Sequence, residues 1–385
     1  MRVLLAFDKF KDALTAQAAV VVAADAVRAA QPDWTIDACP LADGGEGMAE
    51  ILTRSAQGEW REHTVTGPRG APVKAGLGLV AVKNISAAAR AMLGLASATE
   101  GNVAVLAMAS ASGLALLTPD QRDPWHTTSR GTGELIQAAA ATGAVAIIVG
   151  VGGSATHDVG LGALSVLGLT FHPTEGAAIA SPVPATWASL ARVSGKIQPD
   201  LPPLFVACDV TNPLMGTFGA ASVFAPQKGL LEEDFTRLEY MTGRMAALLA
   251  GHAGKPPLLC DTPSAGAAGG LAFGLMCSAN ASLVRGFDLV AAWLDLDQRI
   301  AAADLVFTGE GCFDATSLEG KGPGGIVARA RAAGKPVHVF AGSVQTAADG
   351  VDLHTITPEG QALPAALTQA AANLRRAVRA AVASA

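Results

Sequence analysis

The stretch LIQAAAATGAVAIIVGVGGSAT, residues 135–156, distinguishes a membrane-spanning helix from an α/β fold. It carries no charge, but it is not one continuous apolar segment. It is long enough to span a membrane, which takes about 20 apolar residues. Polar residues and glycines interrupt it after Ala141 and again after Val149. This pattern is typical of a helix, a turn, a buried strand and a loop in succession.

The same alternation of short apolar runs with alanine-rich stretches continues on both sides of this segment. Such alternation is typical of α/β architecture with a largely parallel sheet. Gly, Asp, Ser or Lys follows each run within a few residues, and ligands bind outside the carboxyl ends of parallel strands. The runs predicted as strands are Val3–Phe7, Val103–Met108, Val145–Val149, Leu204–Cys208, Leu305–Thr308 and Val337–Ala341.

Two breaks in this pattern indicate the domain organisation. Over residues 59–82, Val, Thr and Lys alternate with Gly-Pro and Arg-Gly turns, which indicates a hairpin-rich insertion. Near Gly286 the composition returns to a strand-and-helix pattern similar to the N-terminal one. We therefore expect an α/β fold of two domains: a Rossmann-like domain with a parallel sheet built from residues 1–65 and 286–385, and an inserted α/β domain with a mixed sheet, residues 66–285. The active site is expected in the cleft between them.

Composition and charge exclude several classes of protein. Half of the residues are hydrophobic, which excludes disorder, and the net charge of −6 lacks the basic footprint of a nucleic-acid-binding protein. The apolar run Val3–Phe7 is too short for a secretory signal, and no membrane association is expected. The five cysteines form no C-x-x-C pair, so reduced thiols in a cytoplasmic protein are expected. None of the Gly-Lys pairs precedes Ser or Thr, which excludes a P-loop.

The loop after the run at 145–149 has a composition suited to binding anions. Gly150–Ala155 matches the dinucleotide pattern G-x-G-x-x-G/A, but Gly320–Gly325 matches it too, and chance matches are expected among 43 glycines. The continuation Ser154–Asp158 adds two hydroxyls, an imidazole and a carboxylate to the backbone N–H groups. Such a set suits a phosphate or a hydroxy acid.

Carboxylates and lysines follow other predicted strands. They occur in DKFKD (8–12), in DGGEG (43–47), in CDVTNP (208–213), and in TGEG (308–311), which leads to Asp314 and Lys321. FAPQKG (224–229) adds Lys228 in a rigid turn. These are the groups that phosphoryl transfer needs, because that reaction depends mainly on positioning and on neutralising charge.

Taken together, these segments resemble the bacterial glycerate kinase family (type 1, glycerate 2-kinase). The resemblance implies ATP-dependent phosphorylation of D-glycerate in two α/β domains, for most members to 2-phosphoglycerate, with ATP and Mg²⁺ required. The matching stretches are DKFKDALTA (8–16), PLADGGEGM (40–48), MASASGL (108–114), GTGELI (131–136), GVGGSATHDVGLGAL (150–164), ACDVTNPLMG (207–216), FAPQKG (224–229), PSAGAAGGLAFG (263–274), TGEGCFD (308–314) and EGKGPGG (319–325).

The site residues expected from the motifs and the resemblance fall into three groups. The catalytic candidates are Asp43, Asp314, Lys9 and Lys321. The candidates for binding substrate and phosphate are Asp8, Lys11, Glu46, Gly152, Gly153, Ser154, Thr156, His157, Asp158, Asn212, Lys228 and Gly324. The metal candidates are Asp209 and Glu310.

Roles within these groups follow from the chemistry of the reaction. The lysines would neutralise phosphate and carboxylate, and either Asp43 or Asp314 would orient the attacking hydroxyl and accept its proton. Loops 150–158 and 321–325 would hold anionic groups through backbone N–H.

The chain departs from the family pattern at several of these loops. His157 stands where relatives usually carry Asn, and Val159 where they often carry Gly. The remaining departures are Ala107 for a common Glu, Arg130 for a common Tyr and Thr316 for a common Gln. Arg130 could bring a positive charge towards a carboxylate or could simply be solvated.

Two other functions remain open from the sequence. The pattern at 150–155 could belong to a NAD-dependent oxidoreductase of a small 2-hydroxy acid, although only Glu175 could be the acidic residue that such a site needs. Alternatively, the loops could bind glycerate without catalysis, as in a sensor protein.

Overall fold

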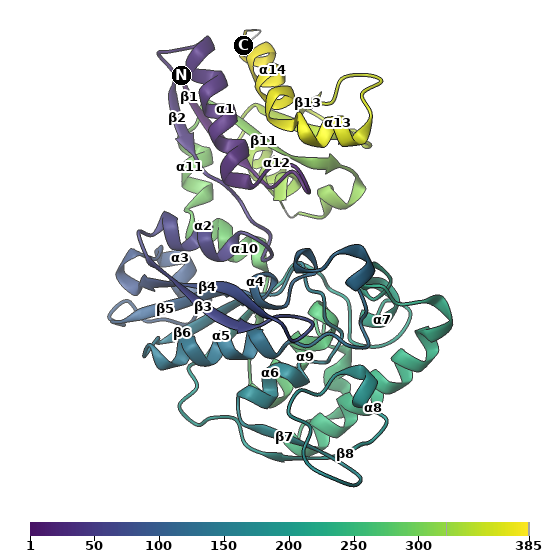
Figure 1. The fold of residues 1–385 in the computed structure, drawn as a ribbon. Coiled ribbons are helices and arrows are strands. Elements are labelled where there is room, and N and C mark those ends of the chain that lie inside the picture. Colours follow the sequence, from purple (N-terminus) through teal and green to yellow (C-terminus); the bar gives the residue numbers. More distant parts are fainter. Residues whose placement is uncertain (321, 384–385) are drawn as a thin grey trace. The chain divides into compact units, whose positions relative to one another are not determined.

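The computed structural model describes residues 1–320 and 322–383, and its chain divides into two compact units. The first unit consists of Met1–Asp43 and Phe287–Ala385, and the second of Gly44–Gly286. Each unit is described by itself below, with its elements labelled as in Figure 1.

The first unit is built around a five-stranded sheet in which all neighbours are parallel. Its strands, in spatial order, are β13 (Asp352–Thr355), β12 (Val337–Val344), β11 (Leu305–Phe313), β1 (Arg2–Phe7) and β2 (Thr35–Ala38). Both ends of the chain therefore contribute to one parallel sheet, as predicted.

Helices cover this sheet because its strands are apolar on both faces. Thr15 caps α1 (Ala16–Ala30) by accepting a hydrogen bond from Ala18 N at 3.1 Å. Helices α1 and α14 (Ala370–Ala383) pack on the face that carries Leu5 and Phe7. Helices α11 (Leu296–Ala302) and α12 (Gly322–Ala332) also contact β1. The remaining helices of this unit are α10 (Gly286–Trp293), which begins at the boundary, and α13 (Leu363–Thr368).

The second unit contains a mixed six-stranded sheet. Its spatial order is β10 (Ser282–Val284), β9 (Leu204–Ala207), β6 (Ala146–Gly150), β5 (Asn102–Ala107), β4 (Pro72–Ala81) and β3 (Glu59–Thr66). The first four strands are parallel, whereas β4 and β3 form the antiparallel hairpin that the turns predicted. A separate hairpin joins β7 (Leu169–Pro173) and β8 (Leu190–Gly195). The predicted fold class is confirmed.

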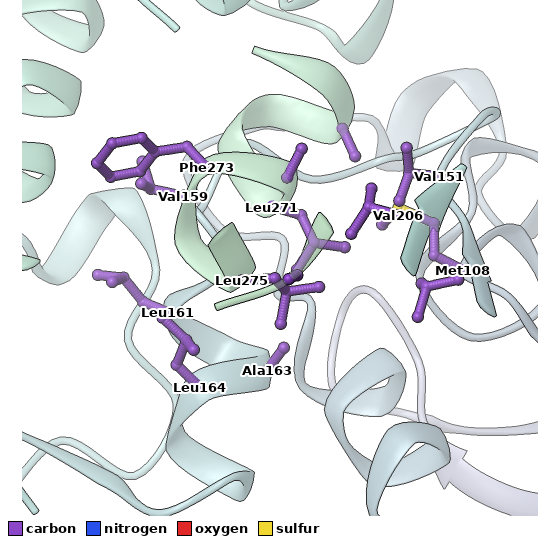
Figure 2. Close-up of a cluster of buried hydrophobic side chains, with 14 of the residues drawn as sticks. Met108, Val151, Val159, Leu161, Ala163, Leu164, Val206, Leu271, Phe273 and Leu275 are labelled. Carbon is purple, nitrogen blue, oxygen red and sulfur yellow. The ribbon is translucent and has the colours of Figure 1, made fainter. Parts of the chain in front are cut away.

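The core of the second unit lies between this sheet and a group of helices. Figure 2 shows Leu271 and Leu275 of α9 (Leu271–Ala279) between α6 (Leu161–Val166) on one side and Val206 of β9 on the other. Helices α5 (Arg130–Ala141) and α8 (Phe235–Ala253) contribute to the same core. Shorter helices are α2 (Met48–Ser55), α3 (Ala87–Met92), α4 (Ala109–Ser112) and α7 (Ala220–Phe224). Within the described residues, no helix is both long enough and apolar enough to cross a membrane.

The structure differs from the sequence prediction in two places that affect the site. The first unit ends at Asp43 and not at residue 65, because β3 pairs with β4 and α2 contacts β4 and β5. Strand β11 continues to Phe313 and does not end at Thr308, because β12 pairs with it as far as Val344. Glu310 therefore lies on a strand and not on a loop.

Candidate functional site

Two groups of predicted site residues emerge, one in each unit. In the first unit, an acidic cluster forms where β1 ends beside β11. Phe7 of β1 pairs with Gly309 of β11, and the N–H of Asp8 donates to the Gly309 carbonyl at 3.0 Å. The next residues along the two parallel chains, Asp8 and Glu310, therefore lie beside each other. Parallel pairing thus brings together two carboxyl groups that are 302 residues apart in the chain.

Asp43 reaches the same place by a different route. After β2 the chain continues beside β1, with the N–H of Leu41 donating to the Phe7 carbonyl at 2.9 Å. The Lys9 ammonium then lies 3.4 Å from Asp43 Oδ1, and both side chains are partly exposed. Two of the predicted catalytic residues therefore form an ion pair at the edge of the acidic cluster.

Glu310 is the group most affected by this cluster. Burial is the largest cause that raises the pKa of Glu310 to about 7, a hydrogen bond from Ser317 opposes it, and the charges of Asp8, Asp314 and Asp43 raise it further. Its Oε1 atom is buried and has no hydrogen-bond partner within the described residues. A carboxyl group in this state favours any ligand that brings positive charge.

Asp314 has a different environment from the other carboxylates. It caps the short helix at Ala315–Glu319, and its Oδ1 accepts from Thr316 N at 2.8 Å, from Thr316 Oγ1 at 2.7 Å and from Ser317 N at 3.3 Å. Three donors already occupy this oxygen, so it has little capacity left to contact a ligand. Thr316 thus positions Asp314.

The remaining candidates of the first unit are Lys11, Gly324 and Lys321, and each has a different environment or lies outside the described residues. Lys11 is exposed. A Cβ on Gly324 would lie 1.7 Å from the Ser317 carbonyl oxygen, so this glycine is required by packing and not only by a ligand. Lys321 lies outside the described residues.

The acidic cluster suits Mg²⁺ better than a metal held by protein alone. Within residues 1–320 and 322–383, no three His, Cys, Asp or Glu side chains are arranged to hold a metal ion. Mg²⁺ is usually bound by one or two carboxylates together with substrate phosphates. The carboxylate chemistry of the cluster and the unpartnered Oε1 of Glu310 fit that mode of binding.

In the second unit, the loop after β6 packs against Gly44 and Gly45. The N–H of Gly152 donates to the Gly44 carbonyl at 3.3 Å. A Cβ on Gly152 would lie 2.7 Å from the Cα of Gly45, and one on Gly150 would lie 2.7 Å from the Gly44 oxygen. The glycines of both motifs therefore allow two backbone segments to touch, and Glu46 is left exposed beside them.

Asp158 is fully buried and accepts four hydrogen bonds. Ser129 donates to Oδ2 from its backbone N–H at 2.7 Å and from its hydroxyl at 2.8 Å, while Gly162 and Gly160 donate to Oδ2 and Oδ1 at 3.2 and 3.1 Å. Burial raises the pKa of Asp158, and these four bonds oppose the shift. Both oxygens of Asp158 already accept hydrogen bonds from the protein, and its role in binding substrate stays a prediction.

Lys228 also differs from its prediction as a ligand-binding lysine. Only 1% of it is exposed, and its Nζ donates to Ser154 Oγ at 2.9 Å and to the Thr156 carbonyl at 2.7 Å. Burial lowers the pKa of Lys228 to about 7, and the charge of Asp158 opposes this. Lys228 therefore holds the loop from inside and does not face solvent.

His157 is fixed by a residue that the motifs did not indicate. Its Nε2 lies 2.9 Å from Thr242 Oγ1 on α8, and that hydroxyl donates to the Leu238 carbonyl at 2.8 Å. A hydroxyl has one proton, so His157 Nε2 carries the proton between the two side chains. Its Nδ1 is then an acceptor that finds no partner within residues 1–320 and 322–383. Burial, with a smaller effect of Lys228, lowers the pKa of His157 to about 3. The imidazole is neutral and structural.

The other candidates of the second unit differ in their exposure. Asn212 Nδ2 donates to the Phe218 carbonyl at 2.8 Å, which closes its own loop. Asp209 is partly buried after β9, in a different unit from Glu310, so their pairing as metal ligands stays a prediction. Gly153 adopts a positive φ of 75°. Thr156 Oγ1 is buried and has no hydrogen-bond partner among the residues that the structure describes.

Arg130 was expected either to bring a positive charge towards a carboxylate or to be solvated, and it pairs with a carboxylate of its own unit. It donates from Nε to Glu134 at 3.0 Å and from NH1 to the Ala180 carbonyl at 2.9 Å. Its guanidinium is therefore already engaged at the start of α5.

Two residues of the second unit escaped the sequence analysis. Ser129 stands two residues before the motif at 131–136, and a serine at the start of a helix is a signal that could have found it. Thr242 lies within α8, and no pattern in the sequence marks it.

The dinucleotide pattern at 150–155 does not have the structure that would support it. In that motif the glycine turn opens directly into a helix whose N-terminus faces the pyrophosphate. Here α6 begins only at Leu161, after the buried segment Thr156–Asp158. The geometry of the loop therefore favours a use other than dinucleotide binding.

Comparison with known proteins agrees with the motifs. The family model described as "Glycerate kinase family" matches residues 3–385. A "Glycerate kinase" of Bacillus subtilis is 37% identical over 95% of this chain and 91% of its own length, and a "Glycerate 2-kinase" of Escherichia coli is 37% identical over 92% and 89%.

A solved structure supports the same assignment. The crystal structure of a putative glycerate kinase 2 from Salmonella typhimurium matches with a TM-score of 0.77 and 36% identity, covering 100% of this chain and 98% of that one. The resemblance seen in the motifs is thereby confirmed, and the chain belongs to the glycerate kinase family.

Proposed function

We propose that this protein transfers the γ-phosphoryl group of ATP to a hydroxyl of D-glycerate and releases ADP, with 2-phosphoglycerate as the product. The observation that carries the proposal is the acidic cluster of Asp8, Asp43, Glu310 and Asp314. Lys9 forms an ion pair with Asp43 of this cluster. The "Glycerate 2-kinase" name of the Escherichia coli relative supports the substrate and the position of phosphorylation.

Asp43 is the better candidate to accept the proton of the attacking hydroxyl. Its described contact is the Lys9 ammonium at 3.4 Å, whereas one oxygen of Asp314 already accepts three hydrogen bonds. A carboxylate oxygen that accepts few hydrogen bonds from the protein is free to meet the hydroxyl of a bound substrate. Asp314 then orients the segment that follows β11.

Charge neutralisation falls to Lys9 and to a divalent cation. Lys9 lies next to the carboxylate that would meet the substrate, where its ammonium can contact an anionic oxygen as well. Glu310 and Asp8 are the proposed ligands of Mg²⁺. When bound, Mg²⁺ neutralises the phosphate oxygens and lowers the charge repulsion within the cluster. The prediction that both units contribute to one site stays a prediction.

The test is an assay of ADP release with D-glycerate, followed by phosphorus NMR of the product. We expect turnover with D-glycerate and a signal of the 2-phosphate. Asp43→Asn should lower kcat by about 10²- to 10⁴-fold, the range for loss of a general base. The matched control is Asp33→Asn, an exposed carboxylate in the same unit, which should keep the wild-type kcat.

The outcomes separate the alternatives. Oxidation of glycerate with a change in NADH absorbance and no ADP would favour the oxidoreductase. Tight binding of glycerate with no turnover, unchanged in Asp43→Asn, would favour a sensor. A 3-phosphate signal would retain the kinase and correct the position of phosphorylation.

A further inference from the structure

The charge of Lys228 determines which group donates in its buried hydrogen bond with Ser154. An ammonium group donates and cannot accept, so Ser154 Oγ is the acceptor in the 2.9 Å bond from Lys228 Nζ. The hydroxyl proton of Ser154 must then point elsewhere. In the part of the chain that the structure describes, Ser154 Oγ takes part in this one side-chain hydrogen bond and donates none.

The two residues differ in their access to a ligand. Lys228 is 1% exposed and gives a second hydrogen bond to the Thr156 carbonyl, so it cannot meet a ligand without leaving the loop. Ser154 keeps 9% of its surface exposed. It lies in the segment after β6, whose glycines bring backbone segments into direct contact. A fixed O–H donor next to a buried positive charge is suited to an anionic oxygen.

We infer that Lys228 is a positioning residue that holds the Ser154 hydroxyl as an obligate donor to an anionic oxygen of the ligand. The inference rests on the proposed function. It assigns Ser154 the contact with the ligand and Lys228 an indirect role, through the direction of one proton. The anionic oxygen belongs either to the carboxylate of glycerate or to a phosphate of ATP, and the two are distinguished by which KM changes.

The neighbouring charges leave this arrangement intact below about pH 7, where Lys228 is mainly an ammonium group. Asp158 and His157 are the titratable groups that interact with Lys228. Asp158 is held by four hydrogen bonds, and the pKa of His157 is about 3, so His157 stays neutral. Lys228 itself has a pKa lowered by burial to about 7. Above that pH a neutral amine can accept the Ser154 proton, and the donor would turn away from the ligand.

The experiment compares Ser154→Ala, Lys228→Met and the double variant in the ADP-release assay. Each single variant should raise one KM by about 10- to 100-fold, as expected for loss of a hydrogen bond to a charged group, and leave the other KM within about twofold. The double variant should be no worse than the worse single variant, because both remove the same donor. Lys196→Met, an exposed lysine of the same unit, is the matched control.

A second measurement covers the case in which Lys228→Met does not fold. The affected KM of the wild-type protein should rise as the pH increases from 6 to 9, and this rise should be absent in Ser154→Ala. Glycerate or ATP affinity, measured by calorimetry for the same proteins, should follow the KM that changes.

Several results would overturn the inference. One is a KM for both substrates that stays within about twofold in Ser154→Ala. Others are additive effects in the double variant, or the same pH dependence with and without Ser154. Equal increases in both KM values would indicate a general distortion of the loop. A wild-type protein without turnover on glycerate contradicts the proposed function itself, whereas an active wild type with unaffected variants contradicts only this inference.

Discussion

The two units treat ionisable groups in opposite ways. In the first unit, burial raises the pKa of Glu310, and the like charges of Asp8, Asp314 and Asp43 raise it further. In the second unit, Asp158 is buried with four donors, and Lys228 is buried with two acceptors. One unit gathers several carboxyl groups around Glu310, while the other surrounds each buried ionisable group with hydrogen bonds.

This difference separates groups available to a ligand from groups that hold a shape. Carboxyl groups gathered in one place cost folding free energy until a cation binds to them. Such clusters with perturbed pKa values are common at functional sites. A buried charge that is fully hydrogen-bonded contributes to the local structure. Removing one partner leaves the other buried without compensation, which costs a large amount of folding free energy. Neutralising a carboxylate should therefore stabilise the first unit and destabilise the second.

The largest effect is expected from Asp158→Asn. The amide NH₂ group cannot accept the bonds from Ser129 and the glycines, and Lys228 loses its opposite charge. The free energy of unfolding should fall by about 3–5 kcal/mol, because more than one buried donor loses its acceptor and each such loss costs about 1–3 kcal/mol. Urea denaturation measures this.

Two further variants sharpen that result. Asp120→Asn, an exposed carboxylate of the same unit, should change stability by less than about 0.5 kcal/mol. Adding Lys228→Met to Asp158→Asn should recover part of the loss, because no unpaired charge then remains buried. Equal stability of Asp158→Asn and wild type would mean that the comparison of the units is wrong.

The opposite sign is expected from Glu310→Gln. The folded pKa of Glu310 is about 7, above the unfolded value of 4.5, so its favourable contribution is complete below pH 4.5 and is lost as the pH rises through 7. At pH 8 the variant should be more stable than the wild type by about 1–3 kcal/mol, and at pH 4.5 the two should agree. Denaturation at both pH values tests this, with Asp33→Asn as the exposed control. A variant that is less stable at pH 8 would refute it.

A smaller effect with its own pH dependence is expected from His157→Asn. At pH 7.5 the variant should lose about 1–2 kcal/mol, because the bond to Thr242 and some buried volume disappear. The folded pKa of about 3 lies below the unfolded value of 6.5, so the contribution of His157 is present above pH 6.5 and falls as the pH drops towards 3. The two proteins should therefore converge between pH 7.5 and 5.5 in urea denaturation. A constant difference would show that His157 does not stay neutral.

The sequence was informative where a strand end determines position. Asp8 and Asp43 could be predicted to approach Glu310, because parallel strands end at one edge of a sheet and short apolar runs mark those strands. The prediction of an α/β fold with a parallel sheet from both chain ends rests on the same patterns. The end of β11 was misjudged, because Gly309 and Gly311 resemble a turn although β12 keeps them paired.

Contacts between distant elements could not be predicted in the same way. A lysine in a turn before a glycine is usually solvated, and only the fold brings Lys228 to Ser154, 74 residues away in the chain. Thr242 meets His157 from the middle of α8, where no local pattern distinguishes it from other helical residues. The boundary at Asp43 depends on the pairing of β3 with β4, which is again a contact and not a composition.

Arg130 gives the smallest expected effect and the most direct test of the second unit as a shape-forming region. If its guanidinium serves only Glu134 and the Ala180 carbonyl, Arg130→Gln should lose about 0.5–1 kcal/mol of stability, as for a partly exposed helical ion pair with one added hydrogen bond. The KM for glycerate should not change, because the carboxylate of the substrate is not its partner. Urea denaturation and steady-state kinetics measure the two quantities. A tenfold rise in that KM with unchanged stability would reverse the argument, since a charge of the second unit would then act on the ligand directly.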